Sequence, residues 1–352
     1  MTKLQKITCS TPHRPTKNIL SRKYVSLTNI GIRSTTTSEC YALNADGKYR
    51  CVAKYPGFIA FLTKKGGYRP TFPYFSSDIE ILSLYLADFK TNSLSMIITP
   101  ESFNLFLIAM AVTAVVVFIA LHFVEAGYGM MYNRRWGATV DNRIGWVAME
   151  APVFIAMLLL WWYSSRRFDT APLVMFLLFE LHYFQRSFIF PLLINGKGRM
   201  PLSIIAMGIT FNVLNALMQG GWIFYISPTD RYPDSWLLTP QFITGTIIFF
   251  AGMAINIHSD YIIRHLRSPG DTAHYIPRGG MFRYVSSANY FGEVVEWTGF
   301  AILTWSWAGA VFALWTFANL APRAGKINRR YASEFGTRFT SLKLKRIIPF
   351  IY

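Results

Sequence analysis

The chain has 352 residues, of which 52% are hydrophobic and only 15% charged, and its formal net charge is +17. Soluble domains carry about 25% charged residues, so this composition indicates apolar surroundings rather than two soluble domains. The three cysteines precede the apolar part of the chain, and neither a Cys-x-x-Cys pair nor a His-Glu-x-x-His motif occurs, so no metal site is predicted. The positive charge comes without a basic amphipathic helix or recognition motif, and we expect no nucleic-acid partner.

The first 95 residues differ from the rest of the chain. They are basic, rich in Ser, Thr and Lys, and lack both a long apolar run and the parts of a secretory signal. We predict a disordered or non-native extension at residues 1–95 and a membrane domain at residues 96–352. Met96 opens the sequence MIITPESFNLFLIAM, a natural start for a first helix, and translation is predicted to begin there.

Seven apolar segments follow, each close to the 20 or so residues that a helix needs to cross a bilayer. They cover residues 103–125, 144–163, 172–194, 202–226, 241–263, 289–304 and 307–322. Only a turn around Ser306 separates the last two, so six or eight spans remain alternatives. The sequence predicts an all-α integral membrane protein with seven transmembrane helices and no internal repeat of the kind that duplicated transporters show.

Basic residues alternate between the loops and predict the orientation. The first, third and fifth loops and the C-terminal segment hold most of them: Arg134, Arg135, Arg143, Lys197, Arg199, Arg264, Arg267, Arg278, Arg283, Arg323, Lys326, Arg329 and Arg330. Lys and Arg accumulate on the cytoplasmic side of membrane proteins. The prediction is therefore N-out and C-in, in a bacterial inner membrane or the endoplasmic reticulum membrane.

Ionisable residues inside the predicted spans mark candidate functional positions, because a charge in lipid is costly. Glu150 lies in the second span, about six residues from its start. The third span contains the run ELHYFQRSF, in which Tyr183 stands one turn from Glu180 and beside His182. A buried carboxyl group at Glu150 would be protonated or paired, and Tyr183 is a candidate hydrogen-bond partner or acid.

Two polar pairs stand near the ends of the fifth and sixth spans. Asn256 and Asp260 are four residues apart, as are Asn289 and Glu293, so each pair shares a helix face. With Arg267, they offer amide, carboxylate and guanidinium groups that suit a phosphate-rich ligand with an amide. Lone polar residues such as Asn212 and Gln219 are interpreted instead as ordinary hydrogen bonds between helices.

Several long motifs occur in order over residues 103–352, namely MEAPVF, ELHYFQRSF, INIHSDYIIRHLRSPG, IPRGGMFRYVSSANYFGEVVEW and IIPFIY. In these motifs the chain closely resembles the steroid 5α-reductases (3-oxo-5α-steroid 4-dehydrogenases). The resemblance implies a seven-helix fold that binds NADPH on its cytoplasmic side and a steroid that enters from the bilayer. It also implies reduction of the Δ4 double bond of a 3-oxo-Δ4-steroid by hydride transfer to C5.

The same resemblance implies roles for individual residues. Glu150 and Tyr183 correspond to the pair that engages the 3-oxo group of the substrate. The implied cofactor contacts are Asn195, Arg199, Asn256, Asp260, Arg267, His274, Asn289, Glu293, Arg329 and Tyr331. His274 and Tyr275 stand where the family often has Tyr-Arg, which is a departure from its pattern. No G-x-G-x-x-G follows a strand, so membrane helices and their cytoplasmic loops would hold the nucleotide.

Three alternatives differ in substrate or in class. A reductase on the same scaffold could act on a polyprenol, a sterol or an enoyl-CoA, although no separate group of basic residues for the CoA phosphates is evident. An isoprenylcysteine carboxyl methyltransferase would carry an Arg-His-Pro-type C-terminal motif, which is absent. A non-enzymatic channel or receptor would bind no nucleotide. The expected partners are a steroid or similar lipid and the membrane lipids, and we expect a monomer.

Overall fold

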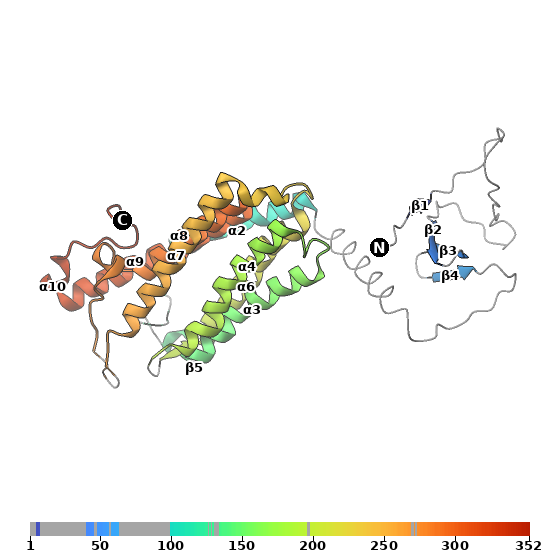
Figure 1. Ribbon diagram of the computed structural model, residues 1–352. Coiled ribbons are helices and arrows are strands. Elements are labelled where there is room, and N and C mark those ends of the chain that lie inside the picture. Colours follow the sequence, from blue (N-terminus) through green and yellow to red (C-terminus); the bar gives the residue numbers. More distant parts are fainter. Residues whose placement is uncertain are drawn as a thin grey trace, which may run out of the picture. The chain divides into compact units, whose positions relative to one another are not determined.

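The computed structural model describes residues 5–7, 40–45, 48–55, 58–62, 99–125, 127, 129, 134–195, 198–268, 271 and 273–352 (Figure 1). The chain divides into two compact units, residues 1–76 and 77–352, and each is described by itself. Met96, the predicted start of translation, lies outside the described residues. The predicted boundary between residues 95 and 96 stays a prediction.

The described part of the first unit is an antiparallel sheet of four strands in the order β1-β2-β3-β4. The strands are β1 (Gln5–Ile7), β2 (Cys40–Ala45), β3 (Lys48–Tyr55) and β4 (Phe58–Leu62). The prediction of an all-α membrane protein is confirmed in part, because the second unit is mostly helical, whereas these strands lie in the first. Their signal is short: runs rich in Tyr, Val, Phe and Ile, with the turn-forming sequences Asp-Gly at 46–47 and Pro-Gly at 56–57. The basic composition of the segment obscured it.

The second unit is mostly helical, and each predicted apolar segment forms a helix. The main helices are α2 (Pro100–Phe123), α3 (Asn142–Tyr163), α4 (Thr170–Phe184), α6 (Leu202–Gly221), α7 (Pro240–Arg264), α8 (Ala288–Thr304) and α9 (Trp307–Phe335). Short elements connect or extend them: η3 (Arg134–Trp136), β5 (Thr139–Asp141), η4 (Gln185–Ile189), α5 (Phe190–Leu192), β6 (Arg199–Pro201), η5 (Trp222–Ile226), η6 (Asp234–Leu238), η7 (Gly280–Arg283) and α10 (Thr337–Thr340).

Five helical stretches within the described residues are long and apolar enough to cross a membrane. They are Pro100–Phe123, Asn142–Tyr163, Thr170–Leu192, Leu202–Ile226 and Pro240–Arg264. The chain is therefore a multi-pass membrane protein. Helix α8 has 17 residues and is shorter than these stretches, and α9 is less apolar than they are, which keeps both outside this set. The count of seven spans stays a prediction.

Helices α2 and α3 begin three and two residues before the predicted apolar segments, because polar caps start them. Thr99 accepts the backbone N–H of Ser102 at 3.2 Å, and Asp141 accepts that of Arg143 at 2.9 Å. Helices α2 and α7 both open with proline, whose missing N–H costs nothing in the first turn. Such caps satisfy donors that a helix start otherwise leaves free.

The helices pack as neighbours far apart in sequence. Helix α3 lies against α4 and α6, while α8 lies between α7 and α9, and α2 packs along α9 (Figure 1). Strands β5 and β6 form a short antiparallel pair that joins the start of α3 to the start of α6. The main apolar core fills the space between these helices, with Phe179, Trp297 and Phe300 at its centre.

The contact between α7 and α8 is unusually close, because glycines face each other across it. Gly245 and Gly252 on α7 stand opposite Gly299 and Gly292 on α8, and both pairs are seven residues apart. A Cβ at any of the four would collide with the backbone of the other helix. The two helix backbones therefore touch directly over two turns, as small residues allow in membrane helices.

A wide turn interrupts the helix that begins at α4. The N–H of Phe190 bonds to the carbonyl of Gln185, five residues back, so residues Gln185–Ile189 form a π turn. Pro191 follows directly, and its ring cannot fit against the carbonyl of a regular α turn. Wide turns of this kind are frequent at functional sites, and this one carries Arg186.

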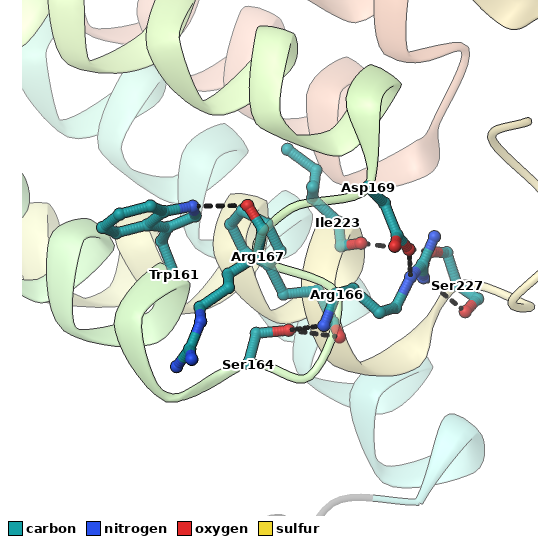
Figure 2. A network of polar contacts seen from close by, with 8 residues as sticks. Trp161, Ser164, Arg166, Arg167, Asp169, Ile223 and Ser227 are labelled. Atoms are coloured by element: carbon teal, nitrogen blue, oxygen red, sulfur yellow. Dashed lines mark hydrogen bonds and ion pairs between the residues drawn. The ribbon is translucent and has the colours of Figure 1, made fainter. Parts of the chain in front are cut away.

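The turn between α3 and α4 is pinned to the end of η5 by Arg166 (Figure 2). This buried guanidinium donates to the hydroxyl of Ser227 at 2.8 Å and to its carbonyl at 3.1 Å. It also pairs with Asp169 at 3.2 Å, while Trp161 donates to the carbonyl of Arg167 at 2.8 Å. The charge of Arg166 is thus paired within the fold.

The glycine contact predicts a strong effect of a single methyl group. We expect Gly252→Ala to lower the stability by at least about 1–3 kcal/mol, because the new Cβ meets the backbone of Glu296 rather than a side chain that could move. Thermal unfolding of the purified protein in detergent measures this loss.

Gly325→Ala in α9 is the matched control, since its Cβ would find its nearest neighbours at an ordinary 3.6 Å. Removing a glycine from a helix interior without strain stabilises by roughly 0.5–1 kcal/mol. Equal unfolding temperatures for Gly252→Ala and the wild type would contradict the close contact.

Candidate active site

A cavity of about 1990 Å³ opens within the second unit. Its wall changes character along the helices. Toward the end of α7, the segment after it and the end of α9, the wall is polar, with Asn195, Arg264, Arg267, Asp271, His274 and Tyr331. Deeper along α2, α6 and α9 it is apolar, with Met110, Val117, Phe211, Leu214, Phe312 and Trp315. One cavity therefore offers both a polar and an apolar compartment.

Most of the site residues expected from the sequence line this cavity. They are Glu150, Tyr183, Asn195, Asp260, Arg267, His274, Asn289, Glu293 and Tyr331. They come from six separate stretches of the chain, so their gathering is a property of the fold rather than of local sequence.

Three expected cofactor residues do not line the cavity. Arg199 donates twice to Thr139, at 2.7 Å to the hydroxyl and 2.7 Å to the carbonyl, because strands β5 and β6 pair beside it. Asn256 lies behind the wall, and Arg329 lines a small hollow of about 320 Å³ with Glu125 and Lys326. Cofactor contacts of these three residues stay predictions from the resemblance.

Glu150 and Tyr183 enter the cavity from α3 and α4, and each is held by α6. The side-chain amide of Asn212 donates to Oε2 of Glu150 at 3.1 Å. The side-chain amide of Asn215 donates to the hydroxyl oxygen of Tyr183 at 3.0 Å. Tyr183 is 4% exposed, whereas Glu150 is half-buried. Both oxygen-bearing groups thus have one polar contact to the protein and a side that faces the cavity.

A buried ion-pair candidate lies beside Tyr183. Nδ1 of His182 and Oε1 of Glu296 are 2.7 Å apart, and both residues are buried. The ring of Trp297 covers this pair, 4.6 Å from the ring of His182 and 5.6 Å from that of Tyr183. The sequence analysis named His182 beside Tyr183, but its pairing with Glu296 across 114 residues could not be predicted from the sequence.

The two polar pairs predicted from the sequence lie close together, Asn256 and Asp260 on α7 and Asn289 and Glu293 on α8. Asn289 donates to Oδ1 of Asp260 at 3.2 Å, and Asn256 donates to the backbone carbonyl of Asn289 at 2.9 Å. Arg186 donates to Oδ2 of Asp260 at 3.3 Å from the π turn. The Arg186 guanidinium also lies over the rings of Trp146 and Phe190. Asn256 therefore contributes by holding Asn289.

The segment after α7 is tied down by charged and polar contacts. Nδ1 of His274 lies 2.7 Å from Oε1 of Glu334 on α9, at the surface. Asp271 accepts the N–H of Ala273 and the hydroxyl of Tyr275, and these hydrogen bonds lower the pKa of its carboxyl group. The same bond to Asp271 raises the pKa of Tyr275. Asp271 consequently stays ionised on the cavity wall at neutral pH.

Tyr331 completes the polar wall from α9. It packs against the ring of Phe339, and burial raises its pKa to about 12. Its hydroxyl group is therefore protonated throughout the neutral range, so Tyr331 can donate a hydrogen bond to a ligand but cannot supply a negative charge.

Comparisons with known proteins identify the family. The family described as 3-oxo-5-alpha-steroid 4-dehydrogenase matches residues 198–352. The mouse (Mus musculus) 3-oxo-5-alpha-steroid 4-dehydrogenase 1 is 40% identical over 245 residues, which cover 68% of this chain and 92% of that protein. The chain belongs to this family. Steroid 5-alpha-reductase DET2 of Arabidopsis thaliana is 38% identical over 240 residues, covering 66% and 90%, and the human dehydrogenase 1 is 41% identical over 217 residues, covering 60% and 81%.

Family membership agrees with the recognition made from the sequence motifs. It does not explain, however, two residues that had no predicted role at the site. Asn212 was interpreted as an ordinary contact between helices, and Asn215 was not considered. The structure places them one turn apart on α6, each bonded to one of the two residues expected to engage the substrate. The spacing of two asparagines in an apolar span was the only available signal.

The two His–Glu contacts predict a difference in stability. Glu296→Ala leaves His182 without its partner inside the aromatic core, and we expect a loss of about 3–5 kcal/mol, as is usual for breaking a buried pair. Glu334→Ala removes a pair of the same length at the surface, where such contacts contribute about 0–1 kcal/mol. Thermal unfolding of both variants in the same detergent tests this contrast. Similar losses in the two variants would count against it.

Proposed function

We propose that the protein is an NADPH-dependent reductase that converts 3-oxo-Δ4-steroids to 5α-3-oxosteroids. The observation that carries the proposal is the position of Glu150 and Tyr183, which lie in a cavity with a charged compartment on one side and an apolar compartment on the other. Membership of a family described as 3-oxo-5-alpha-steroid 4-dehydrogenase supports this reaction. The apolar compartment suits a rigid lipid, and the polar one suits a dinucleotide.

The size and the donors of the cavity fit NADPH. Pockets for one drug-sized ligand measure roughly 300–1,000 Å³, so a cavity of about 1990 Å³ has room for a dinucleotide beside a steroid. Arg267 and Asn195 would hold the phosphates at the polar end, where a guanidinium binds phosphate oxygens in pairs. Asp260 and Asn289 would hold the amide end of the cofactor. When bound, NADPH supplies the hydride for C5 of the substrate.

The side chains of the protein polarise the 3-oxo group of the substrate. Hydride addition at C5 of a conjugated enone moves an electron pair toward the 3-oxo oxygen, and hydrogen-bond donors there stabilise the developing negative charge. We assign this role to the hydroxyl of Tyr183 and to a protonated carboxyl of Glu150. A proton from solvent or a relay then adds to C4, which restores the ketone and completes the saturated bond.

The charge pattern supports seven spans with the N-terminus outside and the C-terminus in the cytoplasm. The polar compartment is formed by the ends that carry Arg264 and Arg267 and by the basic end of α9. The opposite turns have their cations bound internally, since Arg166 pairs with Asp169 and Arg231 donates to the carbonyl of Trp305. The cofactor compartment would then face the cytoplasm. Plant and mammalian relatives favour the endoplasmic reticulum over a bacterial membrane.

Removing either donor should slow the chemical step. We expect Tyr183→Phe and Glu150→Leu each to lower kcat by about 100-fold or more, with a small change in KM, because donors to a developing oxyanion act mainly in the transition state. Turnover of NADPH and a 3-oxo-Δ4-steroid, followed by mass spectrometry, measures this. Tyr225→Phe is the matched control, because Tyr225 donates to the carbonyl of Leu160 and does not line the cavity. Near-normal turnover in both site variants would refute the assignment.

Arg267 should govern cofactor affinity. Hydrogen bonds to charged groups contribute about 1.5–3 kcal/mol, so Arg267→Ala should weaken NADPH binding by roughly tenfold or more and leave the affinity for the steroid unchanged. Arg338→Ala removes the same charge from an exposed position on α10, outside the cavity. Fluorescence titration with NADPH compares the two variants, and equal affinities would exclude a phosphate contact at Arg267.

A further inference from the structure

Helix α6 contacts both substrate-facing groups with the same kind of atom. Asn212 and Asn215 each present a side-chain N–H, one to Glu150 at 3.1 Å and the other to Tyr183 at 3.0 Å. Both asparagines are buried, at 4% and 0% exposure. A buried amide can point either its oxygen or its nitrogen at a neighbour, and the choice decides where the neighbour's own proton goes.

The orientation of the Asn212 amide is determined by the backbone. Its Nδ2 also lies 2.7 Å from the carbonyl oxygen of Met149, which can only accept a hydrogen bond. The nitrogen must therefore be on this side, and its second hydrogen points at Oε2 of Glu150. Since Oε2 accepts from Asn212, a proton on this carboxyl group is directed to Oε1.

The orientation of the Asn215 side-chain amide is determined indirectly, through a second side chain, that of Gln219. Nε2 of Gln219 donates to the backbone carbonyl of Ala308 at 3.0 Å, and the same nitrogen lies 3.5 Å from Oδ1 of Asn215. The oxygen of Asn215 thus faces Gln219, and its nitrogen faces Tyr183. Because the phenol oxygen accepts from Asn215, the hydrogen of the Tyr183 hydroxyl is left to point elsewhere.

We propose that Asn212 and Asn215 are positioning residues that turn both acidic hydrogens, on Glu150 and Tyr183, toward the same substrate oxygen. This inference rests on the proposed function, because it assumes that the two groups donate to the 3-oxo oxygen. Two backbone carbonyls, of Met149 and Ala308, set the direction of the two chains of hydrogen bonds. Helix α6 touches no reacting atom through these residues and acts only by excluding the unproductive proton positions.

The chemistry explains why donation, rather than acceptance, is needed at both positions. An acceptor beside Tyr183 would take the hydroxyl hydrogen and leave a lone pair facing the ketone, which repels the oxygen as its negative charge grows. An N–H beside the phenol oxygen does the opposite, and it also makes the hydroxyl a better donor, since linked hydrogen bonds strengthen one another. The same reasoning applies to the carboxyl group of Glu150.

Crossed double-mutant cycles test the proposal. Asn215→Leu should lower kcat by about tenfold, the equivalent of one net hydrogen bond, with KM changed less than about twofold. In a Tyr183→Phe background, which has no hydroxyl hydrogen to direct, the same substitution should change kcat by less than about twofold. Asn212→Leu should show the same loss of effect with Glu150→Leu as its background, because leucine has neither a proton nor an oxygen to direct.

Each asparagine serves as the control for the other. Asn215→Leu should keep a larger effect in the Glu150→Leu background than in the Tyr183→Phe background, and Asn212→Leu the reverse. A role in packing alone would reduce kcat by the same factor in every background, and that result would overturn the proposal. If Asn215→Leu fails to fold, as judged by NADPH retention, Asn215→Ala removes the same donor without adding bulk.

The outcomes separate this inference from the proposed function. If Tyr183→Phe and Glu150→Leu turn over steroid like the wild type, the proposed function fails. If both substitutions abolish most of the activity but the effects of the asparagine substitutions multiply with them, only the positioning role fails.

Discussion

The backbone contact between α7 and α8 is the constraint on which the rest of the site depends. Four glycines let the two helices touch, and this depth of contact places Asp260 within reach of Asn289. Arg186 then joins the pair from a third helix. Side chains of ordinary size between α7 and α8 would separate these groups by several ångströms and open the wall between the polar and the apolar compartment.

Helix α6 has a different role. Its side-chain amides orient the groups that face the substrate, whereas the contact between α7 and α8 brings polar groups close together. In lipid, a buried amide has few partners, so each one it finds is well defined. The amides of Asn212, Asn215 and Gln219 run from backbone carbonyls to the two groups at the centre of the cavity. The apolar surroundings make these amide side chains costly to bury. The same surroundings leave the orientation of each amide unambiguous.

Much of this arrangement could be predicted from the sequence, and the reasons for the rest are physical. Apolar length predicted the helices, and a spacing of four residues predicted that Asn256 shares a helix face with Asp260, and Asn289 with Glu293. The contact of His182 with Glu296 joins residues 114 apart, which no local pattern encodes. Arg199 and Arg329 were expected in the cavity on the strength of motifs, but the pairing of β5 with β6 turns Arg199 toward Thr139, and Arg329 lies at a separate hollow. The strands near residues 40–62 were hidden by their basic composition.

The π turn at Gln185–Ile189 makes helix length as important as side-chain identity. A π turn contains one residue more than the α turn it replaces, so only the loss of that one residue can be absorbed by a return to regular α geometry. Any other insertion or deletion would turn everything beyond it by about 100° per residue relative to Tyr183, and the chain leading to Asn195 would leave its place on the cavity wall. The number of residues between the group that faces the substrate and the loop that faces the nucleotide is therefore constrained. We expect this region to tolerate substitutions far better than insertions or deletions.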